Sequence, residues 1–233
     1  MVSASAETVA ARVLELLRAG DDERAWREID TLAAQEGFTP AVPGPAAGFR
    51  EIGRDLFWTH TAVSEYVRLQ REQLRRYGDD PAYVRNVTGV FYDLASFTWP
   101  GWGNEVRPED QAAGREAARR CVALREDPAN AEVEFGVTPA MAHWVAGAHA
   151  LAAGDLEEAR RAFQRARERN LEAGEDDTLD RGYLALVDVV ERGDGDALDS
   201  VLAELGARDD EDAAFILDQL VTARELFASE QAR

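Results

Sequence analysis

The chain has 233 residues, of which 45% are hydrophobic, and this is enough for one well-buried domain without disulfides or metals. A formal net charge of -19 argues against nucleic acid as a partner, because neutralising phosphates requires a positively charged face. The only cysteine, Cys121, excludes an internal disulfide and fits a reducing compartment. Every basic residue is arginine, which is typical either of codon bias or of adaptation to a salty cytoplasm.

Neither a secretory signal peptide nor a transmembrane segment is recognisable in the sequence. The segment up to Glu7 lacks a basic start, and Arg12 and Glu15 interrupt the apolar residues that follow it. No later window is a long uncharged apolar run. We therefore expect a cytoplasmic protein that is not exported and contacts no membrane.

Hydrophobic residues recur at helical spacing, and no segment alternates as a strand would, so we expect an all-α protein. An N-terminal helix pair is predicted within residues 1–36. Residues 37–48 contain three prolines and are predicted to form a loop, because proline has no amide donor. A single long helix that belongs to no repeat is then predicted within residues 49–79, from about Glu51 to Tyr77.

Further helices are predicted along the rest of the chain. They are separated by proline, by glycine or by runs of acidic residues, which are the usual boundary signals of helices. The predicted ranges are Pro81 to Phe97, Pro108 to Glu126, a helix through Gly147, a helix that starts at Asp155 and contains Ala166, Asp177 to Glu191, Asp194 to Leu205 and Asp210 to Ser229. The last helix, within residues 207–233, is expected to cap the open face of the preceding one.

The clearest pattern is a pair of helices joined by a turn at Gly154. Small residues such as Gly147 and Ala159 would let the two helices approach closely, with Phe163 filling the gap between them. The turn Ala153-Gly154-Asp155 repeats the turn Ala19-Gly20-Asp21 near the N-terminus, and in both turns an alanine follows four residues after the aspartate. These features indicate an internal repeat.

The pattern resembles the tetratricopeptide repeat (TPR), in which Gly-x2-aromatic marks the first helix and Ala-x3-Phe marks the second. The chain supplies Gly89-x2-Tyr92 and Ala159-x3-Phe163, and it departs from the pattern at Gly147-x2-Ala150. The resemblance is clear over about Asp80 to Glu204. It is weaker over residues 5 to 36, and it is absent from Gly37 to Tyr77.

This resemblance implies a TPR-like α-α superhelix of about nine or ten helices in antiparallel pairs. It would form a single domain over residues 1–233, with residues 80–206 as the repeat region. It also implies a concave surface that receives ligands. Alignment of the two inner helices on their glycines assigns one stripe of residues to that surface: Tyr83, Asn86, Val90, Asp93, Phe97, Met141, Trp144, Ala148 and Leu151.

Two groups of residues in this region leave alternatives open. Asn86 and Asp93 are polar residues in a helix that is otherwise apolar nearly all round, so they either hydrogen-bond to a neighbouring helix or contact a ligand. Trp99 and Trp102 lie in an insertion from Thr98 to Arg107 that replaces the short turn of the family. They are expected to form either the lip of a binding groove or a plug that fills the space of the missing turn.

The spacing of the three histidines does not favour a metal site or acid-base catalysis. His60 lies on an apolar stripe after Leu56, which favours a core histidine, although it could instead pair with Asp93 as a general base. His143 and His149 are six residues apart and lie on different faces of one helix. No catalytic or metal-binding motif is recognisable in the sequence, so we expect no catalytic residue, no metal and no cofactor.

The favoured function is non-catalytic binding of a peptide or protein partner in the concave groove. The groove would be formed by Tyr83, Asn86, Asp93 and Trp144, with the tryptophan insertion at its rim. Two alternatives stay open. One is a small-molecule or enzymatic pocket around His60, Asp93, Trp99 and Trp102, and the other is self-association into a homo-oligomer.

Overall fold

The structure, a computed structural model, describes residues 4–36, 44–78, 83–130 and 136–230. Within these ranges it contains eleven α-helices, two 3-10 helices and no strand, so the all-α prediction is confirmed. The α-helices are α1 (Ala4–Arg18), α2 (Asp22–Glu36), α3 (Gly44–Trp58), α4 (Val63–Tyr77), α5 (Val84–Phe97), α6 (Pro108–Glu126), α7 (Pro139–Ala152), α8 (Leu156–Ala173), α9 (Thr178–Arg192), α10 (Asp196–Gly206) and α11 (Glu211–Glu230). The 3-10 helices are η2 (Pro100–Trp102) and η3 (Pro128–Asn130).

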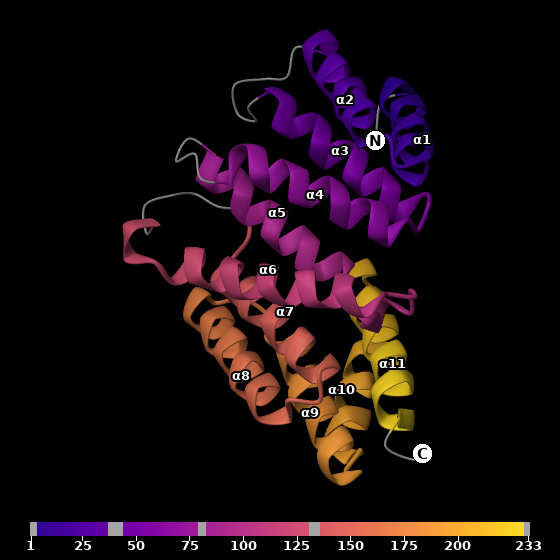
Figure 1. The fold of residues 1–233 in the computed structure, drawn as a ribbon. Helices are drawn as coiled ribbons and strands as arrows, with labels where there is room; N and C mark the ends of the chain where they lie inside the picture. Colours follow the sequence, from indigo (N-terminus) through magenta and orange to yellow (C-terminus); the bar gives the residue numbers. More distant parts are fainter. Residues whose placement is uncertain (1–3, 37–43, 79–82, 131–135, 231–233) are drawn as a thin grey trace.

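The helices are stacked in the order in which they occur in the chain (Figure 1). Each helix packs mainly against its neighbours in sequence, so that α1 contacts α2, α2 contacts α3, and the series continues to α10 and α11. None of the described helices is both long enough and apolar enough to cross a membrane.

The two glycine-aspartate turns have the same backbone geometry. Gly20 and Gly154 have φ values of 76° and 74°, in the left-handed region that glycine adopts without strain. The amide of Asp21 donates to the carbonyl of Leu16 at 2.9 Å, and the amide of Asp155 makes the equivalent bond to Ala150 at 3.0 Å. The repetition seen in the sequence therefore corresponds to a repeated way of ending one helix and starting the next.

The predicted close approach of α7 and α8 is present. A Cβ atom built on Gly147 would lie only 2.7 Å from Cε1 of Phe163, a distance that real side chains do not reach. Phe163 is fully buried, as is Ala159 one turn before it. The absence of a side chain at Gly147 thus creates the space that the phenylalanine ring fills.

The single long helix predicted from Glu51 to Tyr77 is wrong, because the chain turns back between α3 and α4. The turn is closed by backbone bonds from Thr61 to Phe57 at 3.1 Å and from Ala62 to Leu56 at 2.8 Å. Thr61 has a φ of 48°, which β-branched residues rarely adopt. No glycine or proline marks this turn, and the apolar spacing continues through it, so helical periodicity alone could not locate it.

The predicted loop over residues 37–48 is also revised. Residues 37–43 lie outside the described part of the chain, whereas residues 44–48 belong to the first turns of α3. Pro45 is the second residue of this helix, where its missing amide costs no hydrogen bond. Pro45, which was predicted to lie in a loop, is therefore compatible with the first turn of α3.

The last helix does more than cover α10. It contacts α9 and α10, and it also packs against η2 in the tryptophan insertion. In Figure 1 one end of α11 reaches back toward the level of α5 and α6. The C-terminal helix therefore connects two parts of the chain that are far apart in sequence.

The packing of Gly147 against Phe163 can be tested by adding a single methyl group. We expect Gly147→Ala to lower the free energy of unfolding by about 1–3 kcal/mol, because the methyl overlaps a buried ring. Gly206→Ala is the matched control, since no atom lies within 4 Å of its added Cβ, and it should be neutral or slightly stabilising. Urea denaturation of both variants measures the difference. Equal stability of the two variants would contradict the close packing.

Candidate functional site

An apolar cavity of about 260 Å³ lies among α5, α7, α9 and α11. We call it the aromatic cavity, because six of its lining residues carry aromatic rings, which come from α3, α5, η2, α7 and α11. Its lining consists of Trp58, Tyr92, Ser96, Phe97, Trp102, Ala140, Met141, Trp144, Asn170, Leu179, Asp180, Phe215 and Gln219.

The tryptophan insertion forms part of the wall of this cavity. Trp102 lines the cavity, donates from Nε1 to the carbonyl of Ser96 at 2.7 Å, and packs on Phe215 of α11 at 5.9 Å between ring centroids. Trp99 is fully buried behind this wall, where it contacts Trp144 at 5.7 Å. The two tryptophans therefore differ in role, since one fills the interior and the other borders the cavity.

Gly101 allows the insertion to fold in this way. A Cβ on Gly101 would lie 2.1 Å from Cζ2 of Trp99, so the indole ring packs directly against the glycine backbone. Trp99 also contacts Tyr183 of α9 at 5.8 Å and Phe227 of α11 at 6.2 Å. The ring thus joins the insertion to both helices that border the cavity.

The polar end of the aromatic cavity is formed by Asp180 and Asn170. Asp180 is 1% exposed, and its Oδ2 accepts a hydrogen bond from Nδ2 of Asn170 at 2.7 Å. Burial raises the pKa of Asp180 to about 7, and the nearby charge of Asp177 acts in the same direction. Asp180 therefore changes its charge near neutral pH at the edge of an apolar cavity.

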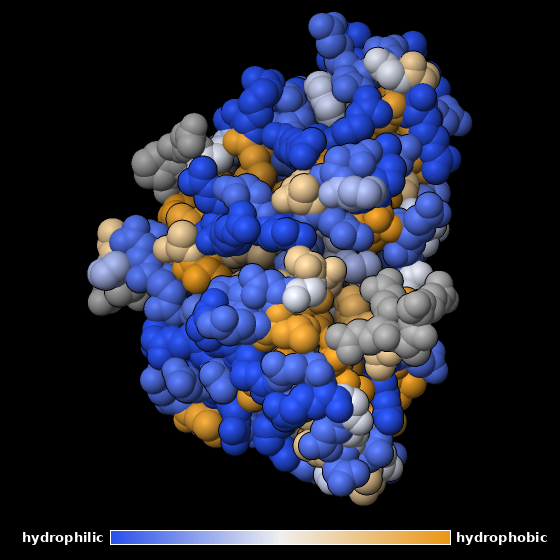
Figure 2. All heavy atoms as spheres, turned by 60° about the horizontal axis from the view of Figure 1, so that its bottom comes forward, coloured by the Kyte–Doolittle hydropathy of each residue, from blue (hydrophilic) through white to orange (hydrophobic). Residues whose placement is uncertain are grey.

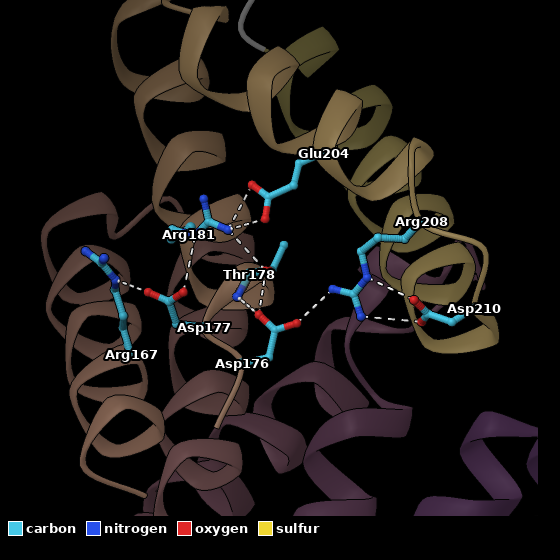
Figure 3. Close-up of polar contacts among 8 residues, drawn as sticks. All are labelled: Arg167, Asp176, Asp177, Thr178, Arg181, Glu204, Arg208 and Asp210. Atoms are coloured by element: carbon cyan, nitrogen blue, oxygen red, sulfur yellow. Dashed lines mark hydrogen bonds and ion pairs between the residues drawn. The ribbon is translucent and has the colours of Figure 1, made fainter. Parts of the chain in front are cut away.

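A network of ion pairs fixes the start of α9, which carries Asp180 (Figure 3). Asp176 accepts hydrogen bonds from the hydroxyl and the amide of Thr178 and pairs with Arg208, and these contacts lower its pKa to about 2. Arg208 also pairs with Asp210 at 2.9 Å. The network therefore ties the start of α9 to the segment that precedes α11.

A second cavity, of about 390 Å³, adjoins the first. We call it the arginine cavity, because three arginines contribute to its lining. It is lined by Arg50, Arg54, Gln73, Arg85, Asn86, Gly89, Val90, Tyr92, Asp93, Gly136, Val137 and Met141. Tyr92 and Met141 line both cavities, so the two spaces share part of a wall.

Asp93 is the one carboxylate among the described residues that line the arginine cavity. Burial raises its pKa, whereas the charges of Arg50 and Arg54 lower it. Its Oδ2 forms an ion pair with Nε of Arg50 on α3 at 3.2 Å. A hydrogen-bonded ion pair with a neighbouring helix therefore accounts for this polar residue on α5.

The structure brings most of the predicted site residues together. Phe97, Trp102 and Trp144 line the aromatic cavity, and Asn86 and Asp93 line the arginine cavity. Trp99 lies behind the wall and touches neither space.

Tyr83 and His60 lie elsewhere. Tyr83 packs against Tyr77 at 5.2 Å and lines neither cavity. His60 lies in the turn between α3 and α4, where its Nε2 is 3.4 Å from Oδ2 of Asp55. The alternative that paired His60 with Asp93 is therefore wrong, because Asp93 pairs with Arg50 and His60 pairs with another carboxylate.

Several lining residues were not identified from the sequence. Asp180 precedes Tyr183 and Val187 on the apolar face of α9, at a spacing of three and then four residues, and an acid on such a face is a usable signal. Phe215 and the arginines of α3 gave no comparable signal. Their role depends on which helices face each other, and sequence spacing within one helix does not contain that information.

Figure 2 shows one face of the molecule, where hydrophilic residues dominate and hydrophobic residues reach the surface in smaller areas. Among the described residues, no group of three or more histidine, cysteine, aspartate or glutamate side chains is placed to hold a metal ion. Comparison of the chain with protein-family models, curated proteins and solved structures found no match. The functional assignment therefore depends on the fold and on the two cavities.

The raised pKa of Asp180 predicts how stability depends on pH. The folded protein keeps the proton up to about pH 7, whereas the unfolded chain releases it near pH 4, so stability due to this group falls as the pH rises from about 4 to 7. We expect Asp180→Asn to raise the free energy of unfolding at pH 8 by at least about 1 kcal/mol, because one pKa unit corresponds to about 1.4 kcal/mol.

Urea denaturation at pH 5 and pH 8 checks this expectation. Asp209→Asn, at an exposed position, makes the same change in charge and serves as the control. A gain at pH 8 that also appears in the control, or that is equally large at pH 5, would show that burial of Asp180 is not its cause.

The two tryptophans of the insertion are expected to respond differently to truncation. Trp99→Ala should lower the free energy of unfolding by about 3–5 kcal/mol, because it empties a fully buried site. Trp102→Ala should cost less, since this ring is partly exposed. Urea denaturation of the two variants measures the difference, and a larger loss for Trp102→Ala would reverse the roles assigned to them.

Proposed function

We propose that the chain is a TPR-like helical-repeat protein that binds a small organic molecule without catalysing a reaction, and that the ligand places an apolar group in the aromatic cavity. The repeat assignment is supported by the sequential packing of the helices, by the two equivalent glycine-aspartate turns and by the contact of Gly147 with Phe163. A cytoplasmic location belongs to the same proposal.

The single observation that carries the binding function is the aromatic cavity itself. Its lining is mostly apolar with a few polar groups at the edge, which is the usual composition of a site for a small organic molecule. Trp144 supports this assignment, because its Nε1 is buried without a hydrogen-bond partner among the described residues. A ligand with an acceptor atom could satisfy this donor.

A small molecule fits this geometry better than an extended peptide. The helix α11 packs against both α9 and η2, and its Phe215 and Gln219 line the cavity. Trp144, which was expected on an open groove, is only 4% exposed. The cavity is therefore a half-open, bordered space, which suits a compact ligand better than an extended chain.

A peptide or protein partner remains the second candidate, and a specific observation favours it. Trp58 and Phe215, which border the cavity, are 61% and 54% exposed. Exposed aromatic side chains are common anchors at protein interfaces. A partner, including a second copy of this chain, would cover these two rings and insert one large apolar side chain into the cavity.

Filling the cavity tests the proposed function. The probe is phenylnaphthylamine, an uncharged aromatic dye whose fluorescence increases in apolar surroundings. Ala140 is buried and lines the cavity, so we expect Ala140→Phe to weaken dye binding at least about tenfold, equivalent to about 1.4 kcal/mol. Fluorescence titration of the folded variant, checked by circular dichroism, provides the measurement.

Ala112→Phe is the matched control, because it adds the same ring at an exposed position of α6. It should leave dye binding unchanged. Absence of dye binding to the unmodified protein, or equal binding to both variants, would remove the small-molecule proposal. The partner proposal would then be tested by the loss of binding or self-association on Trp58→Ala.

A further inference from the structure

Two arginines of the arginine cavity lack the ion pairs that most arginines of this protein form. The chain has 45 acidic residues for 26 basic ones, and most of the described arginines lie within 4.0 Å of a carboxylate oxygen. Arg54 and Arg85 form no ion pair with any described residue, yet both line the same cavity. A site with more positive than negative charge among the described residues of so acidic a protein favours a negatively charged partner.

The balance of charge inside the cavity is positive. Arg50, Arg54 and Arg85 contribute three guanidinium groups, whereas the described lining contains the single carboxylate of Asp93. Arg50 forms an ion pair with Asp93, and Arg54 is close enough to lower the pKa of the same carboxylate, so among the described residues three guanidinium groups share one negative charge. A guanidinium group can donate two parallel hydrogen bonds to two oxygens of a carboxylate, sulfonate or phosphate. Two guanidinium groups in one cavity therefore suit an anionic ligand.

The positive region is continuous with the aromatic cavity. On α3, Arg50, Arg54 and Trp58 follow one another at intervals of four residues and so lie on one side of the helix. The first two line the arginine cavity, and Trp58 lines the aromatic cavity. The polarity of the binding surface therefore changes along a single helix.

The facing helix repeats this change. On α5, Asn86 and Asp93 line the arginine cavity, whereas Phe97 near the end of the helix lines the aromatic cavity. Tyr92 of α5 and Met141 of α7 contribute to both. Two helices that present polar side chains at one end and aromatic rings at the other define a site for an elongated molecule with a polar and an apolar end.

We propose that the ligand of the aromatic cavity is an amphipathic anion. Its aromatic or aliphatic body occupies the aromatic cavity, and its carboxylate, sulfonate or phosphate group is bound by Arg54 and Arg85. This proposal rests on the proposed small-molecule function and specifies the chemical class of the ligand. The pair formed by Arg50 and Asp93 neutralises the one carboxylate in the described lining of the arginine cavity, where the anionic group would lie.

Two dyes that share one ring system separate the two ends of the site. Anilinonaphthalene sulfonate carries a sulfonate, and phenylnaphthylamine is its uncharged parent. We expect the double variant Arg54→Ala, Arg85→Ala to weaken sulfonate binding at least about tenfold, because two charge-assisted contacts are lost. Binding of the uncharged dye should change less than about twofold, since the aromatic cavity is unaltered.

The matched control is the double variant Arg24→Ala, Arg71→Ala. These arginines also form no ion pair with a described residue, and they line neither cavity, so the control makes the same change in net charge. It should bind both dyes as the unmodified protein does. An equal loss of sulfonate binding in both double variants would show that only the overall charge matters, and it would overturn the proposal.

A measurement on the unmodified protein provides an independent check. Added sodium chloride should weaken binding of the sulfonate dye and leave the uncharged dye unaffected, because only the charged contact is screened. If phenylnaphthylamine binds and the sulfonate dye shows neither salt dependence nor sensitivity to Arg54 and Arg85, the anion proposal fails and the small-molecule function stands. If neither dye binds, the proposed function itself fails.

Discussion

The burial of Trp99 against Gly101 is the packing interaction on which the candidate site depends. The glycine backbone leaves room for the indole ring, and the ring contacts Trp144 of α7, Tyr183 of α9 and Phe227 of α11. The contact with Phe227 adds to that of Trp102 with Phe215 in holding the insertion against α11. The insertion and α11 together border the aromatic cavity, where Trp102 and Phe215 contact each other.

The charge around the two cavities differs from the net charge of the whole chain. The overall charge is strongly negative, and ion pairs between arginine and carboxylate groups connect neighbouring helices, as in the network at the start of α9. Such exposed pairs contribute little stability individually. Around the two cavities the arrangement differs, since one space is apolar with a single buried acid and the other has more guanidinium than carboxylate groups.

The sequence predicted those features that depend on local spacing. Helical periodicity identified most of the helices. The Gly154-Asp155 pair identified a turn, and in the structure this glycine adopts the left-handed backbone conformation. The approach of Gly147 to Phe163 was also predictable, because both residues belong to one helix pair. The turn at Thr61 was missed, since a threonine in the left-handed region carries no glycine or proline signal.

The candidate site was only partly predictable for a related physical reason. Asn86, Asp93, Phe97 and Trp144 were predicted to share one surface because residues three and four apart share a face of a helix, and each of them lines one of the two cavities. The contributions of Arg54, Asp180 and Phe215 depend on contacts between helices that are distant in sequence. The packing of α11 on η2 joins two segments that are far apart in sequence, so closing this contact carries a cost in loop-closure entropy. Most of the other helix contacts join neighbours in sequence, so the aromatic cavity is the part of the fold whose walls require a contact between distant segments.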